Sequence, residues 1–375
     1  MPVEFIGWIA PRVASEIIPP SGPVWSNDVI AQTAQVHEAA GFDRVLIGYF
    51  SNAPDGFLVG AHAAASTDRL GMLLAHRPGF VAPTVAARKL ATLDQLSGGR
   101  LAVHIISGGA DSDQAKDGDY LGHAERYQRS AEYVQVLRRT WTSAEPFDHH
   151  GDFYRVDRAW SDIRCVSPDG IPVYGGGGSD AAVELLTPGL DVFMLWGEPL
   201  AETAQMMERV RAAKPDGTVD FSVSTRPILA ATDAEAWERA YDILDRIGAG
   251  GRRRRTPRNV GSQRLLDIAE RGDVHDSCLW TAPAAATGAP GNTTALVGSP
   301  ETVAQALLGY HRLGATSLLI RGFDPLPDAI EYGTELIGRV RQLVAADDAA
   351  SAPPDNGGVD LTQPERTSAS EKSGA

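Results

Sequence analysis

Cysteine is scarce in this sequence, with Cys165 and Cys278 the only two among 375 residues. Two thiols are too few for a disulfide framework or for a metal site built of thiolates. We therefore expect two unreactive thiols in a reducing compartment. The nine histidines include no His-x-His pair at a predicted strand end, so no metal site is expected.

Long apolar runs and an excess of basic residues are also missing. No stretch approaches the roughly 18 apolar residues of a membrane-spanning helix, and the first residues, MPVEF, do not resemble a secretory signal. The formal net charge of −14 disfavours contact with phosphate backbones. We expect a cytoplasmic protein that binds neither membranes nor nucleic acids. The one basic run, Arg252 to Arg255, is either a solvated loop or part of a mobile cover over an anionic ligand.

Apolar runs of strand length alternate along the chain with amphipathic stretches of helix length. The predicted strands are 4–9, 44–48, 70–75, 101–106, 172–175, 190–195, 219–224 and 316–320. The predicted helices are 27–40, 56–67, 83–97, 123–141, 179–187, 199–213, 233–247 and 300–313, with one more at about 326–345. Parallel strands buried on both faces cannot alternate polar and apolar residues, so this pattern predicts an α/β fold, a closed (β/α)8 TIM barrel.

Two insertions interrupt this pattern, after the fourth and the seventh strand. Residues 142–171 predict a hairpin that turns near His150. Residues 248–298 are rich in Gly, Arg, Thr, Ala and Pro and are too long for an ordinary connection, so we expect a mobile lid. Residues 347–375 have almost no large apolar groups and are expected to be a disordered tail behind a single domain, 1–346.

A glycine-rich loop, VYGGGGSDAA at 173–182, lies between the fifth predicted strand and its helix. Glycines let main-chain N–H groups approach a phosphate, and a following helix offers its positive end. The loop is therefore either a phosphate cradle or a flexible turn in which Ser179 or Asp180 caps the helix. No Walker lysine or dinucleotide fingerprint accompanies it.

Polar residues at two further places are candidates for a site. His123 and Tyr127 begin a long predicted helix and share one face at the i, i+4 spacing. His104 and Ser107 end the fourth strand, where barrel enzymes place their functional groups. A histidine at a helix start is also commonly a cap or a surface group, so both interpretations stay open for His123.

Several ordered blocks between residues 1 and 345 resemble the alkanesulfonate monooxygenase branch of the luciferase-like flavin monooxygenases. The blocks are GFDRVLI (41–47), RP (77–78), PTVAAR (83–88), ATLDQLS (91–97), HAERY (123–127), WGEP (196–199) and TALVG (294–298). The resemblance implies a two-component enzyme that receives reduced FMN (FMNH2) from a separate NAD(P)H-dependent flavin reductase and is a homo-oligomer. Molecular oxygen would give a flavin peroxide that attacks a small organosulfur substrate, an alkanesulfonate or a sulfone.

The resemblance also implies positions for the cofactor. The FMN phosphate is expected at Gly177, Gly178 and Ser179. The ring and ribityl parts are expected near four further residues, namely Asp55, Ser107, His123 and Tyr127.

The sequence departs from the family at the sulfonate site, where only Trp196 matches outright. The departures are Ala53 for a Cys, Phe323 and Pro325 for a Tyr and a His, Val13 for a His, Ser224 and Arg226 for an Arg-x-His pair, His104 for an Asn, and no lid Arg within 287–293. We expect Trp196, Arg226 and His104 to be catalytic. Two interpretations stay open. In the first, Arg12, Arg226 and Arg321 replace the missing anion donors, although an ion pair at the barrel rim is an equal alternative for Arg321. In the second, the substrate is less charged than a sulfonate.

Two other functions fit the same barrel. One is an oxidoreductase that uses a deazaflavin for hydride transfer. The other is a non-catalytic flavin-binding protein that retains the phosphate loop but has lost reactive groups.

Overall fold

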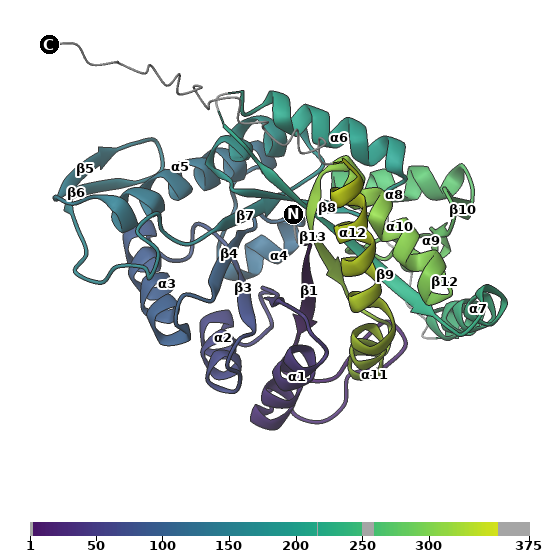
Figure 1. The fold of residues 1–375 in the computed structure, drawn as a ribbon. Coiled ribbons are helices and arrows are strands. Elements are labelled where there is room, and N and C mark those ends of the chain that lie inside the picture. The colour runs from purple at the N-terminus through teal and green to yellow at the C-terminus, as the bar shows by residue number, and fades with distance from the viewer. Residues whose placement is uncertain (1–2, 216, 250–258, 352–375) are drawn as a thin grey trace, which may run out of the picture.

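Eight parallel strands close into a barrel at the centre of the molecule (Figure 1). The computed structural model describes residues 3–215, 217–249 and 259–351. The barrel strands are β1 (Glu4–Ile9), β2 (Arg44–Ile47), β3 (Gly71–His76), β4 (Leu101–Ile105), β7 (Val173–Gly176), β8 (Val192–Trp196), β9 (Asp220–Leu229) and β13 (Ala315–Ile320), in that order around the barrel. All eight neighbouring pairs are parallel, which confirms the predicted (β/α)8 fold.

Helices surround the barrel (Figure 1). The principal ones are α1 (Asn27–Ala39), α2 (Gly56–Ala65), α3 (Pro83–Ser97), α5 (His123–Thr142), α6 (Leu200–Ala212), α7 (Asp233–Ala249), α10 (Pro300–Leu313), α11 (Pro325–Glu331) and α12 (Gly338–Ser351). The ends of α3 follow from its sequence. Pro83 is accepted in the first turn, where its missing N–H group is not needed, and Gly98 ends the helix in the left-handed conformation, with φ +67°. α12 continues past residue 346 to Ser351, and the rest of the predicted tail lies outside the described residues.

The helix predicted after the glycine-rich loop is present but irregular. The chain is helical from residue 180 to residue 189, and it includes the π-helical turn η2 (Ala182–Leu186) and the 3-10 turn η3 (Thr187–Gly189). Pro188 lacks an N–H group and interrupts α-helical bonding there. The loop is therefore followed by a short, irregular helix rather than by a regular α-helix.

Much of the segment predicted as an irregular lid is a packed layer of sheet and helix. It contains α8 (Val260–Glu270), β10 (Val274–His275), β11 (Leu279–Trp280), α9 (Ala282–Thr287) and β12 (Ala295–Gly298). β12 pairs in parallel with the second half of β9, and Ala295 faces Arg226 in this register. β9 therefore runs five residues past its predicted end at 224. Arg252 to Arg255 lie outside the described residues.

The second insertion is the expected hairpin, made of β5 (Phe147–His150) and β6 (Arg155–Ala159). Glu132 on α5 holds its turn, accepting hydrogen bonds from Phe153 N and Tyr154 N at 2.9 and 2.8 Å. The hairpin projects from the barrel beside α5 (Figure 1).

Both cysteines are free and buried. Burial raises the pKa of Cys165 to about 12 and that of Cys278 to about 11, so both thiols are protonated at neutral pH. No helix in the described parts of the chain combines the length and apolarity needed to cross a bilayer.

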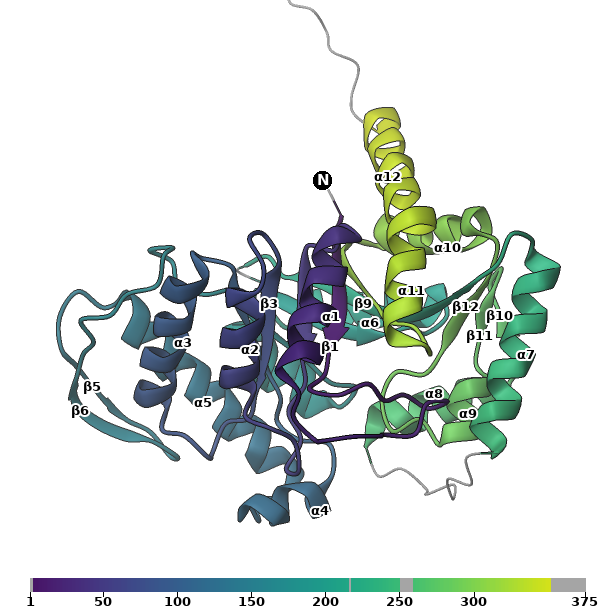
Figure 2. The ribbon, with the colours of Figure 1, turned by 90° about the horizontal axis from the view of Figure 1, so that it is seen from below.

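The carboxyl ends of the barrel strands form a mouth that other elements surround. Figure 2 shows the short helix α4 (Asp111–Gln114) at the same end of the barrel as α8 and α9, whereas α12 extends from the opposite end. Functional groups of parallel barrels gather at the carboxyl ends of the strands, so the site is sought there.

Candidate active site at the barrel mouth

A cavity of about 690 Å³ opens at the carboxyl ends of the strands. Nearly all the predicted site residues line it, namely His104, Ser107, His123, Tyr127, Gly177, Gly178, Ser179, Trp196 and Arg226. Asp55 is the exception. Its carboxylate caps α2 by accepting from Leu58 N at 3.1 Å, and it is exposed outside the cavity lining. The structure therefore gives Asp55 a helix-capping position rather than a cofactor contact.

The glycine-rich loop leaves no room for side chains at its centre. A Cβ atom on Gly177, whose φ is +151°, would lie 2.4 Å from Tyr127 Oη and 2.7 Å from Ala182 Cβ. Ser179 Oγ accepts from Ala182 N at 3.3 Å and lies 3.2 Å from His123 Nε2. Ser179 thus caps the turn, as one interpretation held, and faces the predicted histidine at the same time.

His123 and Tyr127 share the first turn of α5 and face this loop. Their rings meet edge to face with centroids 5.1 Å apart. Burial lowers the pKa of His123 and raises the pKa of Tyr127, with Arg126 adding to the effect on the histidine. At neutral pH both side chains are uncharged and can donate a hydrogen bond to an anion.

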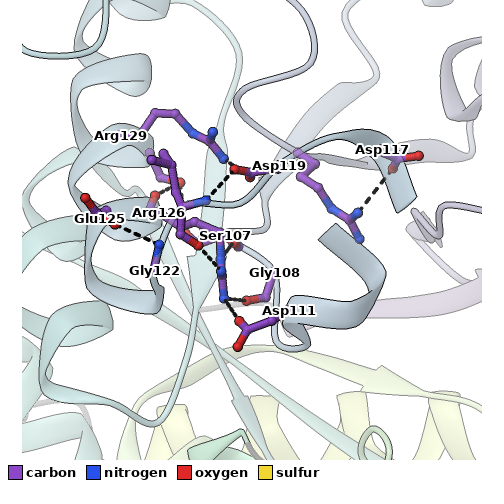
Figure 3. Close-up of polar contacts among 12 residues, drawn as sticks. Ser107, Gly108, Asp111, Asp117, Asp119, Gly122, Glu125, Arg126 and Arg129 are labelled. Carbon is purple, nitrogen blue, oxygen red and sulfur yellow. Dashed lines mark hydrogen bonds and ion pairs between the residues drawn. The ribbon is translucent and has the colours of Figure 1, made fainter. Parts of the chain in front are cut away.

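Arg126, between these two residues in the chain, was not predicted as a site residue. Its side chain is 1% exposed and donates to Ser107 O at 3.1 Å, Leu121 O at 2.5 Å and Asp111 Oδ1 at 2.9 Å. Figure 3 shows this guanidinium joining the end of β4 to α4 and α5. Arg126 therefore fixes the connection that carries Ser107, and the HAERY block was the signal that could have found it.

Two uncharged polar side chains of the cavity wall, His104 and Gln114, have hydrogen-bonding atoms without a partner among the described residues. His104 Nδ1 is buried and has no partner among the described residues, and both amide atoms of Gln114 are in the same state. Burial lowers the pKa of His104 to about 4, so its ring is neutral and accepts or donates a single bond at each nitrogen. Buried polar atoms of this kind are usually paired, which fits a polar ligand in the cavity. Gln114 was missed because its segment has no sequence motif.

The predicted Arg226 is part of a buried charge triad with Glu16 and Arg321. Glu16 Oε2 lies 2.8 Å from Arg226 Nη2, and its Oε1 accepts from Arg321 Nη2 at 2.8 Å. Arg226 also stacks on Phe323, 3.8 Å from the ring centroid. Burial raises the pKa of Glu16, but the charges of both arginines outweigh this and lower it to about 2. Arg321 thus makes the ion pair that one interpretation assigned to it.

The start of α8 forms the wall beside Trp196 and the glycine-rich loop. Gly261 packs so closely against Trp196 that an added Cβ would lie 3.0 Å from the indole ring. Arg264 reaches past Gly178 to Glu198, with Nε 2.8 Å from Oε1. The segment predicted as a lid therefore does border the cavity, through residues 259–261, 264 and 290–293. Within the described residues no group of three or more metal-binding side chains occurs.

Comparison with known families decides the relationship. Residues 4–317 match the family model described as luciferase-like monooxygenase. The chain is a member of this family. The fold, the mouth cavity and the glycine-rich loop described above are thus features of a luciferase-like monooxygenase.

Solved structures with the same fold differ widely in sequence from this luciferase-like monooxygenase. The EDTA monooxygenase from Chelativorans sp. BNC1 is 16% identical, with a TM-score of 0.70 over 92% of this chain and 95% of that one. The oxygenating constituent of 3,6-diketocamphane monooxygenase from Pseudomonas putida, in complex with FMN, is 18% identical, with a TM-score of 0.68 over 92% and 99%. An F420-dependent secondary alcohol dehydrogenase is 15% identical, with a TM-score of 0.65 over 91% and 99%.

Proposed function

We propose that this chain is a two-component, FMN-dependent monooxygenase that acts on a small organosulfur compound and receives reduced FMN from a separate flavin reductase. The observation that carries the proposal is the geometry of the loop at Gly177. A Cβ on Gly177 would fill the space beside Tyr127, and the hydroxyl group of Ser179 faces His123. Bound reduced FMN supplies the electrons with which one atom of O2 is transferred to the substrate.

The residues around the cavity have separate tasks in this proposal. Gly177, Gly178 and Ser179 hold the single terminal phosphate, and His123 and Tyr127 donate to it. His104, Ser107 and Gln114 offer polar atoms to the remaining cofactor and substrate groups. Trp196 and the start of α8 keep water from the reacting atoms, which prevents loss of electrons to peroxide.

The first test is the choice of flavin. FMN is expected to bind more tightly than FAD, because the loop offers one terminal phosphate site and no dinucleotide fingerprint accompanies it. Titration calorimetry with FMN, FAD and a deazaflavin measures the order. Oxygen uptake with photoreduced FMN and a panel of sulfonates and sulfones then tests the reaction. Tighter FAD binding, or no substrate-dependent oxygen uptake, would contradict the proposal.

The second test concerns the two donors of α5. His123→Ala and Tyr127→Phe are each expected to weaken FMN binding by about 1–3 kcal/mol, the contribution of one hydrogen bond to a charged group. Fluorescence titration of FMN measures the loss, and thermal unfolding checks that each variant folds. His62→Gln, on an exposed part of α2, is the matched control. Unchanged FMN affinity in both variants would reduce His123 and Tyr127 to residues of a helix start.

A deazaflavin oxidoreductase is the second candidate, and the observation that favours it is the shared fold of the F420-dependent dehydrogenase. Preference for the deazaflavin in the titration, with hydride transfer and no oxygen uptake, would establish it. Tight FMN binding without turnover of any compound would instead favour a non-catalytic flavin-binding protein.

A further inference from the structure

We propose that Arg321 binds the acidic head group of the organic substrate, and that this substrate is a monoanion with an apolar body. Glu16 and Arg226 act as positioning residues that hold Arg321 and limit the charge of its partner. The inference rests on the proposed function, because it assigns the substrate class of the same cavity.

The charges of the cavity wall leave one positive charge unbalanced. Two arginines are matched by carboxylates of the same wall, whereas Glu16 alone serves two arginines; the pairs are Arg77 with Asp113, Arg264 with Glu198, and Glu16 with Arg226 and Arg321. The histidines of the wall, His104 and His123, both have lowered pKa values and are neutral at pH 7. The excess lies on the triad, so one negative charge on a ligand at Arg321 completes the balance there, apart from the phosphate that the loop holds elsewhere in the cavity. A dianion at Arg321 would have a second negative charge without a cationic partner in the triad, which is costly.

Of the two arginines in the triad, Arg321 is the more exposed. The side chain of Arg226 is 1% exposed; its Nη2 contacts Glu16 and Gly322 O, and its Nε and Nη1 are buried without a hydrogen-bond partner among the described residues. The side chain of Arg321 is 29% exposed, and among the described residues only Nη2 of its guanidinium has a hydrogen-bond partner. The guanidinium also lies 5.1 Å from the centroid of the Trp8 ring, which fixes its plane against an aromatic wall. A planar fork with free donors is suited to the oxygens of a carboxylate or a sulfonate.

Arg321 lies across the mouth from the phosphate loop. The loop follows β7, while Arg321 follows β13 and Glu16 follows β1. Around the barrel β13 is three strands from β7 in one direction and five in the other, and β1 is four strands from β7 in either direction. The cavity therefore has two anion-binding places on opposite sides, one for the cofactor phosphate and one for another anion. The wall of the same cavity also contains apolar side chains, among them Leu46, Ile106, Met194 and Leu319. An apolar body attached to the anion would cover these side chains.

Matched pairs of ligands that differ in charge test the assignment. The probes are hexanesulfonate against methyl hexyl sulfone, and hexanoate against hexanamide, titrated by calorimetry into the full chain with and without FMN. Each anion is expected to bind about tenfold or more tightly than its neutral partner, as one charge-assisted fork implies. Arg321→Gln is expected to remove the preference, and Arg321→Lys to restore part of it. The two pairs show whether the site prefers the sulfonate or the carboxylate.

A second variant tests the charge count independently of Arg321. Hexyl phosphate as a dianion, at pH 8.5 and with FMN occupying the phosphate loop, is expected to bind more weakly than hexanesulfonate to the wild-type protein. Glu16→Gln removes the shared carboxylate, so the order of these two ligands should reverse. Arg339→Gln, which changes an exposed arginine paired with Glu301 on the opposite end of the molecule, should alter neither comparison.

Each remaining outcome counts for or against the proposal. Equal affinity of the wild-type protein for anion and neutral partner overturns it, and so does an unchanged preference in Arg321→Gln. If Arg321→Gln weakens FMN binding and leaves the anion preference intact, the arginine serves the flavin instead. If the wild-type protein prefers the anions but binds no flavin, the proposed function fails and the substrate assignment stands.

Discussion

Replacing Arg226 with methionine is expected to lower the free energy of unfolding by about 3–5 kcal/mol, a large effect for one side chain. Methionine keeps most of the stem's volume but removes the guanidinium that neutralises Glu16. The carboxylate would remain in the interior with Arg321 as its only cationic partner. Gly322 O would also lose its donor, and Phe323 its stacked cation. Urea unfolding of the wild type and the variant at pH 7 measures the loss.

A double-mutant cycle separates the ion pair from the packing. Glu16→Gln with Arg226→Met removes both partners of this ion pair, so the loss of stability in the double variant is expected to be smaller than the sum of the two single losses. Arg312→Met breaks an exposed pair with Asp347 and should cost far less stability than Arg226→Met. Additive losses in the cycle would mean that Arg226 stabilises the barrel through stacking, not through Glu16.

This triad shows where sequence reasoning about Arg226 stopped. Its position in the family pattern predicted a donor facing substrate oxygens, and the structure does place it in the cavity wall. Glu16 lies 210 positions earlier, in a loop without regular structure, and no local pattern links the two. The pairing depends on β9, β13 and β1 being neighbouring strands of the barrel, which only the tertiary structure shows. The accessible cation is therefore Arg321, which sequence alone could not separate from Arg226.

The barrel itself was predictable because its strands are buried on both faces. The run 71–75 contains no polar residue, and such a run fits a strand of a parallel barrel, which is buried on both faces. β12 was missed because its four residues lie in a Gly- and Pro-rich stretch, and the second half of β9 because Arg226 and Pro227 interrupt the apolar pattern. Both are stabilised by pairing with each other, which a single segment does not show.

The sequence indicated the glycine-rich loop and the residues facing it more fully than the side chains around them. Gly177 and Ser179 stand out because four glycines in a row have few structural uses, and His123 and Tyr127 share a helix face by spacing alone. The supports of this site, Arg126 and Gln114, act through contacts with backbone far away in sequence or through packing. Asp55 was misplaced because the same residue type serves equally as a helix cap.

Acidification is expected to destabilise the protein strongly between pH 6.5 and pH 4. Burial lowers the pKa values of His37, His76 and His104 from 6.5 to about 4. Below pH 6.5 the unfolded chain binds protons that the folded chain does not, so each step down in pH favours unfolding. Each histidine contributes at most about 1.4 kcal/mol per pH unit in this window. Asp328 opposes one of them, because burial raises its pKa to about 6 and the folded state takes up that proton first.

Urea unfolding at pH 7.5, 6.0 and 5.0 measures this slope, and we expect up to about 3 kcal/mol per pH unit, equivalent to two unopposed histidines. His104→Asn is the informative variant, because its Nδ1 has no protein partner among the described residues and the change removes one titrating group at little structural cost. The slope should decrease, by less than half, because His104 borders the mouth cavity, which water can enter. His62→Gln, at an exposed site, should leave the slope unchanged. A stability that is flat between pH 7.5 and 5.0 in the wild type would show that these rings are hydrated in the folded state.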